Sequence, residues 1–319
     1  MLDCGALRKA IDNYIRKADD ELEAALDTAG FVEPEETVNE MSALEERVAR
    51  ALKDETEIII DSLGDAVDLA EYAQEIWPTV KLNDDLAEKL NVVFFEEFSS
   101  FLPEIANQYI KKIDPELTVT VITQRTTEWV KSWSEELADI MKLNSHAEIE
   151  TILSKSLAEG HSVAELTQDI LDSGIRDEYY KARRVSVTET LRAHSYAQHE
   201  AITQNPAVED KMWRHTGNHQ NEPRQNHVDM DGQIVSKGEP FELVGADGAT
   251  YYPMYPRDSI LPAGEAINCH CIEQPVVSED VLGLSLEERQ RLQAEAIAED
   301  DGEWEKELDA RNRAKAGIE

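Results

Sequence analysis

Two cysteines near the end of the sequence are the residues most able to do chemistry. Cys269 and Cys271 flank His270 in the stretch INCHC, whereas the third cysteine of the 319 residues is the remote Cys4. Half of the eight histidines fall in the same part of the sequence: His215, His219, His227 and His270. Zinc prefers thiolate and imidazole ligands, usually four of them in a tetrahedral site. This region therefore carries a candidate metal-binding cluster.

The spacing of the two cysteines suits a shared ligand position. Alternate residues of an extended segment face the same side, so Cys269 and Cys271 would point to one place and His270 away from it. A small, loop-rich unit with little hydrophobic core needs further stabilisation, which a structural metal ion can provide. The alternative is that both cysteines are buried as small apolar side chains.

The chain is expected to be a soluble protein of a reducing compartment. Cys269 and Cys271 are too close to form an easy disulfide and Cys4 is remote, so no disulfide framework is expected, and the alternative to a reducing compartment is a protein stabilised in another way. Residues 1–20 lack the apolar run of a signal peptide. No stretch approaches the roughly 18 consecutive apolar residues that a membrane helix needs, so no membrane association is expected.

The strongly acidic composition argues against nucleic acid as a main partner. The sequence has 67 Asp and Glu against 31 Lys and Arg, a formal net charge of −36. Binding to phosphates requires clustered Lys and Arg. The longest basic cluster, residues 181–184, is short and is interpreted as a solvated helix surface.

Apolar residues at three- and four-residue spacing predict amphipathic helices over residues 1–145. In the first helix these positions are Leu7, Ile11, Tyr14, Ile15, Ala18, Leu22 and Leu26. Gly30 is expected to end that helix, and Trp77-Pro78 to interrupt a later one. The acidic pairs in these helices are interpreted as solvated, so no catalytic group is predicted there.

Residues 146–204 predict a helical bundle. A break at Gly160-His161 separates two helices, and Ser162 and Glu165 have the spacing of a capping box. The apolar period then continues through a long helix.

The amino-acid composition of the sequence changes after residue 204. Residues 205–277 are rich in Gly, Pro, Asn and Asp, and two Asp-Gly pairs, Asp231-Gly232 and Asp247-Gly248, predict hairpin turns. We therefore expect a mainly α protein in four parts. These are an extended helical N-terminal domain (1–145), a helical bundle (146–204), a small α+β, loop-rich Cys/His module (205–277) and an acidic helical tail (278–319).

The order of residues in the loop-rich region resembles the phage minor head (Mu-F-like head-morphogenesis) family. The matching positions are Trp213, Arg224, His227, Asp231, Gly232, Pro240, Phe241, Asn268, Cys269 and Cys271. Upstream, Thr188 and Glu189 hold the places of a Thr-Glu pair on a helix with a basic start. The resemblance covers about residues 120–275. It depends on the order and spacing of these residues taken together.

The resemblance implies a structural zinc site with His227, Cys269 and Cys271 as ligands. Four residues are alternatives for the fourth ligand: His215, His219, Asp229 and His270. Water is another, and a site that holds no metal stays open. The sequence departs from the family where His270 replaces the usual Arg, and where Ala266 replaces a His that some members carry.

The remaining residues of the pattern are expected to be structural. Trp213 and Phe241 should lie in the core of the module, and Asp231-Gly232 should form its turn. Glu189 is expected to pair with Arg224.

The resemblance implies a structural, non-enzymatic role in the virion. Such proteins are similar to minor capsid components, present in a few copies, that bind the portal vertex and act in head assembly and, in some members, genome delivery. The expected partners are the portal protein and other head proteins. The expected location is the phage head near the portal vertex, after assembly in the host cytoplasm.

Two other functions are compatible with the sequence. His227, Asp229, Asn268 and His270 loosely resemble a metal-dependent His-Asn-His nuclease, although the required ββα pattern is not evident after Cys271. A purely helical adaptor with incidental cysteines is the other. Metal content separates the adaptor from the zinc-containing head protein.

Overall fold

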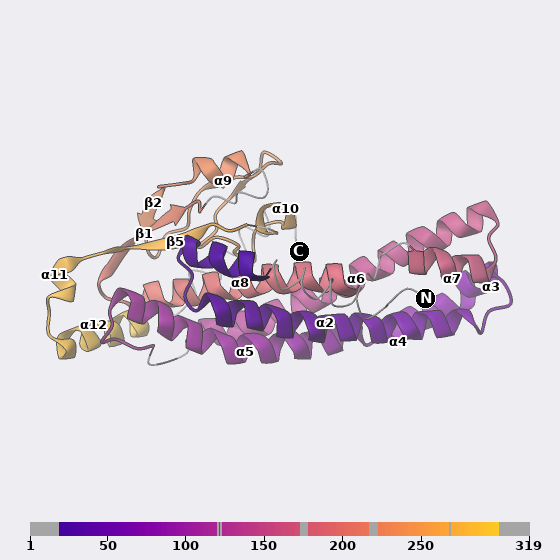
Figure 1. Ribbon diagram of the computed structural model, residues 1–319, viewed down its shortest axis with the longest axis horizontal. Coiled ribbons are helices and arrows are strands. Elements are labelled where there is room, and N and C mark those ends of the chain that lie inside the picture. Colours follow the sequence, from indigo (N-terminus) through magenta and orange to yellow (C-terminus); the bar gives the residue numbers. More distant parts are fainter. Residues whose placement is uncertain are drawn as a thin grey trace. The chain divides into compact units, whose positions relative to one another are not determined.

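The computed structural model describes residues 19–119, 121, 123–172, 178–216, 223–267 and 269–299 (Figure 1). Several predictions concern residues outside these ranges: the helix positions Leu7 to Ala18, His219, Asn268 and the tail beyond residue 299. The chain divides into two compact units whose segments alternate along the sequence. Unit 1 comprises residues 1–41, 100–127 and 187–319, and unit 2 comprises residues 42–99 and 128–186.

Helices account for most of the described residues, which confirms the mainly α fold. Residues 19–29 are helical, and Gly30 follows with a φ of +89°, a conformation that glycine adopts readily. The longer helices are α2 (Pro34–Leu63), α5 (Leu86–Ile113), α6 (Gln124–Glu159), α7 (Val163–Asp172), α8 (Glu178–Gln204) and α12 (Leu286–Glu299). Helix α6 crosses residue 145, and the four-part division of the sequence stays a prediction.

The hydrophobic core of unit 2 joins residues from several helices. Its buried members are Ile59, Leu63, Leu69, Tyr72, Trp77, Ile149, Leu153, Leu166 and Ile170. The predicted capping box forms at the start of α7: the Ser162 N–H donates to Glu165 Oε2 over 2.7 Å, and the Glu165 N–H donates to Ser162 Oγ over 3.3 Å.

The interruption expected at Trp77-Pro78 is wrong. The chain stays helical through α3 (Leu69–Glu71), the π-helical turn η1 (Tyr72–Ile76) and α4 (Trp77–Asn83). Pro78 lies in the first turn of α4, where a backbone N–H has no required intrahelical acceptor. The long helix before it ends at Leu63 instead, ahead of a turn at Gly64.

Unit 1 contains the strands. Strands β2 (Ile234–Ser236), β1 (Val208–Arg214) and β5 (Ile272–Val277) form an antiparallel sheet in that order. Strands β3 (Leu243–Val244) and β4 (Thr250–Tyr251) form a separate hairpin. Short helices α9 (Gln225–Asp229), α10 (Ala263–Ala266) and α11 (Glu279–Leu282) complete the region (Figure 1).

Only one of the two Asp-Gly pairs joins paired strands. Gly248, with φ +81°, turns the β3–β4 hairpin as expected. Gly232, with φ +85°, instead links α9 to β2, and its N–H donates to the Trp213 carbonyl at the end of β1 over 2.8 Å. A turn therefore forms at both pairs, but the hairpin expected at Asp231-Gly232 is wrong.

The core beside the sheet contains both cysteines of the INCHC stretch. Its buried members are Trp213, Met230, Phe241, Leu243, Tyr251, Leu261, Ala266, Cys269 and Cys271. Among the described helices, none has the length and apolar character needed to cross a membrane.

Candidate metal centre

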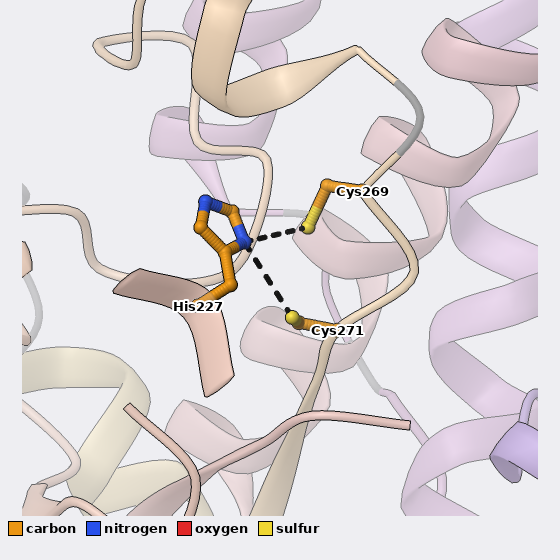
Figure 2. Close-up of side chains that lie close together, drawn as sticks. All are labelled: His227, Cys269 and Cys271. Atoms are coloured by element: carbon orange, nitrogen blue, oxygen red, sulfur yellow. Dashed lines mark hydrogen bonds between the residues drawn. The ribbon is translucent and has the colours of Figure 1, made fainter. Parts of the chain in front are cut away.

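Two short elements bring the predicted ligands together. His227 lies in α9, which begins after Arg224 in extended backbone, and the two cysteines lie between α10 and β5. All three side chains are buried, with 2–3% of their surface exposed. Figure 2 shows the His227 ring pointing between the two sulfur atoms.

The distances between these side chains match one face of a tetrahedral zinc site. His227 Nδ1 lies 3.5 Å from Cys269 Sγ and 3.6 Å from Cys271 Sγ (Figure 2). The three ligand atoms all lie within 4.8 Å of one another. With Zn–S near 2.3 Å and Zn–N near 2.0–2.1 Å, tetrahedral geometry places nitrogen and sulfur about 3.6 Å apart. The three residues therefore fit zinc in both type and spacing.

A buried carboxylate orients the histidine. Glu265 Oε2 lies 2.9 Å from His227 Nε2, and the same carboxylate accepts hydrogen bonds from the Asn226 side chain and the Ala246 N–H. When the ring is neutral and the carboxylate accepts the Nε2 proton, the lone pair on Nδ1 faces the sulfur atoms. Metal-binding histidines in proteins usually have such an acidic or carbonyl partner.

The environment favours ionisation of one thiol. A hydrogen bond with Cys271 lowers the pKa of Cys269 against the effect of burial, and His227 and the charge of Arg257 lower it further. The pKa of Cys271 is raised, first by Cys269 and then by burial. Zinc binds cysteine as the thiolate, which is the form that the lowered pKa favours at Cys269.

Arg257 fixes the backbone of the two cysteines. Its Nη1 donates to the carbonyls of Cys269 and Cys271 over 2.7 and 2.9 Å. Its Nε donates to the Leu191 carbonyl over 3.0 Å, and its Nη2 to Ser195 Oγ over 2.5 Å. The side chain is 1% exposed. One guanidinium therefore ties the cysteine loop to helix α8.

Neither Glu265 nor Arg257 was predicted from the sequence. Glu265 lies in the sequence AGEA and Arg257 in YPRDS. Neither sequence differs from those of exposed loops, so neither residue stood out as part of a site. Their partners are distant in sequence: His227 lies 38 residues from Glu265, and Leu191 lies 66 residues from Arg257.

His215 is the alternative fourth ligand that the structure brings to a thiol. Its Nδ1 lies 3.6 Å from Cys271 Sγ, although it is not one of the three residues in the compact group. Asp229 is exposed and accepts a hydrogen bond from Gln225. His270 is half-buried, and its carbonyl accepts from Thr216. His219 lies outside the described residues.

The aromatic residues of the pattern lie where they were expected. Trp213 is fully buried, and its ring contacts His227 and Phe241 edge-on, at centroid distances of 5.9 and 5.4 Å. Asp231 accepts from the His215 N–H over 2.9 Å, which places the turn beside the candidate fourth ligand.

Glu189 and Arg224 bond to different residues. Glu189 accepts from Arg192 Nε over 2.8 Å, and Arg192 in turn donates to the Arg257 carbonyl. Arg224 donates to the Ile267 carbonyl over 2.5 Å, next to the cysteine loop. The Glu189–Arg224 pair expected from the sequence is not among these contacts.

Comparison with known proteins identifies the group to which this arrangement belongs. Residues 147–273 match the family model described as Phage Mu protein F like protein. An uncharacterized protein of Bacillus subtilis (strain 168), YqbB, is 39% identical over 215 residues, which cover 67% of this chain and 69% of the relative. The chain belongs to the Phage Mu protein F like family.

The stretch that matches the Mu F-like family includes helix α8, strands β1 and β2, the start of β5 and the whole candidate metal centre. Membership assigns the chain to phage head morphogenesis, as the resemblance in the sequence implied. No solved structure matches the chain.

Proposed function

We propose that this Mu F-like protein is a structural minor head protein of a tailed phage, present in a few copies per virion and bound to the portal vertex during head assembly. The observation that carries this proposal is the burial of the Cys/His centre. His227, Cys269 and Cys271 expose at most 3% of their surfaces, and His227 is already bonded to Glu265. A site closed in this way suits a structural ion, whereas catalytic zinc keeps a position open for substrate.

Zinc at this centre would hold the module together. His227, Cys269 and Cys271 would be three ligands, and His215 would be the fourth because its ring already lies beside Cys271. The ion would join α9, the end of β1 and the loop before β5, beside the small core of this region. In small modules of this kind the free energy of metal binding contributes directly to folding.

The charge of the chain supports a protein partner. A formal net charge of −36 opposes binding to DNA and favours a partner surface that carries basic patches. The portal protein is the proposed partner, with other head proteins as further contacts. Association should then weaken as the salt concentration rises.

Co-expression with the portal protein of the same phage tests the proposal. The wild-type chain should co-purify with the portal and contain about one zinc ion per chain at this centre. The double variant Cys269→Ser/Cys271→Ser should lose both properties. Cys4→Ser, which alters the third cysteine, is the matched control and should retain both.

A different result would favour the nuclease alternative. If the purified chain cleaved DNA in the presence of metal, lost that activity in His227→Ala with its fold intact, and failed to bind portal at low salt, the structural assignment would be wrong. Circular dichroism of each variant separates lost folding from lost function.

A further inference from the structure

Unit 2 contains a second group of metal-type ligands, far in sequence from the cysteines. Glu55 on α2, Asp84 between α4 and α5, and His146 on α6 each place one ligand atom within 4.8 Å of the other two. The three residues come from three separate stretches of the chain. All belong to unit 2, so the arrangement is internal to one compact part of the molecule.

The group is enclosed by the protein. Glu55 is 3% exposed, and the side chains of Asp84 and His146 are 4% and 12% exposed. The Trp77 ring meets His146 edge-on, at a centroid distance of 5.6 Å. A carboxylate in such surroundings is costly unless its charge is compensated. Two carboxylates side by side also repel each other.

The orientation of Asp84 is fixed in a way that leaves one oxygen toward the group. Its Oδ1 accepts the Leu86 N–H over 2.8 Å at the start of α5, while its Oδ2 contacts His146 Nε2. Lys142 donates to the Asp84 backbone carbonyl, so α6 holds this corner at a second point. Asp84 is therefore positioned as a ligand through Oδ2 alone.

The charges of the group suit a divalent cation. Two carboxylates and a neutral imidazole carry a net charge of −2, which one divalent ion cancels. Imidazole with carboxylate oxygens is a donor set for ions such as Zn²⁺ and Mn²⁺.

We propose that Glu55, Asp84 and His146 form a second divalent transition-metal site, which links helices α2 and α6 to the start of α5. It differs from the Cys/His centre in having no sulfur ligand, and the inference does not depend on the proposed role in head assembly. The site is structural: its ligands join three stretches of unit 2, as a cross-link would.

Cobalt binding to the full-length chain tests this site separately from the first. Cobalt bound by thiolates gives a charge-transfer absorption, whereas cobalt held by nitrogen and oxygen does not. The wild-type chain, titrated with Co²⁺ in excess Mg²⁺ to occupy surface carboxylates, should bind two ions. Asp84→Asn should bind one and keep the thiolate absorption, because asparagine still caps α5 but loses the charge.

A neighbouring residue provides the matched control. Asp85 is 57% exposed and pairs with Lys89 over 2.7 Å, so Asp85→Asn removes the same charge one residue away. It should bind two ions. Glu55→Gln is a second variant that leaves the α5 cap untouched, and it should also bind one. Equal cobalt stoichiometry in the wild type, Asp84→Asn and Glu55→Gln would overturn the proposal.

Discussion

At the scale of single residues, the Cys/His centre depends on groups that do not themselves touch the proposed ion. Glu265 sets which nitrogen of His227 faces the sulfur atoms, and Arg257 fixes the two cysteine carbonyls. Both are buried, so their hydrogen bonds have little competition from water.

Replacing Glu265 by glutamine should weaken zinc binding without unfolding the module. The amide keeps the size of the side chain but loses the charge that holds the Nε2 proton, and changes of this kind cost about 10- to 100-fold in metal affinity. Competition against a chromogenic zinc chelator measures the effect.

Asp229→Asn is the control for the Glu265 variant. Asp229 is an exposed carboxylate two residues after His227, and it was one of the alternatives for the fourth ligand. Its replacement should leave the zinc affinity unchanged. An equal loss in both variants would mean that general charge near the site matters, and not the bond to Nε2.

Residue types and their order predicted part of this site. His227, Cys269 and Cys271 were identified because thiol and imidazole groups are rare in the sequence and lie in a familiar order. Glu265 and Arg257 could not be found in this way. Glutamate and arginine are common on surfaces, and only the folded chain brings these two against partners tens of residues away.

At the scale of elements, His194 joins three parts of unit 1 at one point on α8. Its Nε2 lies 2.8 Å from Thr37 Oγ1 on α2, and its Nδ1 lies 3.3 Å from the Tyr109 hydroxyl on α5. Phe31 and Phe101 meet the ring edge-on. Burial, and then the positive charge of Arg257, lower the pKa of His194 to about 3.

This histidine should make unit 1 sensitive to acid. Between pH 6.5 and about 3 the unfolded chain binds a proton at His194 that the folded chain does not. The free energy of unfolding should therefore fall as the pH falls through this window, by up to about 1.4 kcal/mol per pH unit. Urea unfolding at steps from pH 7 to pH 4 measures the slope.

His194→Phe removes the titrating group and keeps an aromatic ring. The variant should be less stable at pH 7, because Thr37 and Tyr109 lose a partner, but its stability should depend less steeply on pH. Comparison at equal metal loading isolates the contribution of His194. A folded-state imidazole that titrates near its ordinary pKa would contradict the prediction.

The sequence predicted elements best where local signals act alone. The capping box of α7, the glycine after residue 29 and the Asp247-Gly248 hairpin each depend on neighbouring residues, and each is present. The Trp77-Pro78 interruption was wrong because Pro78 lies in the first turn of α4, and the Asp231-Gly232 hairpin was wrong because tertiary strand pairing decides it. A buried Trp77 stays helical, and β2 pairs with β1 instead of with the segment before the turn.

At the scale of the whole chain, residues near the end complete a unit that begins near the start. Arg289 on α12 pairs with Asp114, which is 1% exposed, and with Glu116 over 2.5 Å. Gln293 adds a hydrogen bond to the Thr118 carbonyl over 2.8 Å. These contacts attach α12 to the segment that follows α5.

Arg289→Ala should destabilise unit 1 strongly. Removal of one member of a buried ion pair leaves the other charge without compensation, at a cost of about 3–5 kcal/mol. The thermal midpoint should fall, and limited proteolysis should cut near residues 278–285.

Arg291 offers a matched control on the same helix. It is 53% exposed, and within the described part of the chain it pairs with its helix neighbours Glu288 and Glu295. Exposed pairs contribute about 0–1 kcal/mol, so Arg291→Ala should behave like the wild type. Similar proteolysis of both variants would show that the Asp114 pair does not hold α12.

The pairing of Asp114 with Arg289 also sets an order of events on the ribosome. The two residues are 175 positions apart. At about 5–20 residues per second, Arg289 is therefore synthesised roughly 9–35 s after Asp114. Both segments of unit 2 have been synthesised by residue 186, well before that moment. A nascent chain can therefore complete unit 2 first, whereas unit 1 closes only when the last described helix emerges. In a chain whose translation stalls before residue 289, unit 2 could fold, whereas unit 1 would lack the pair between Arg289 and Asp114.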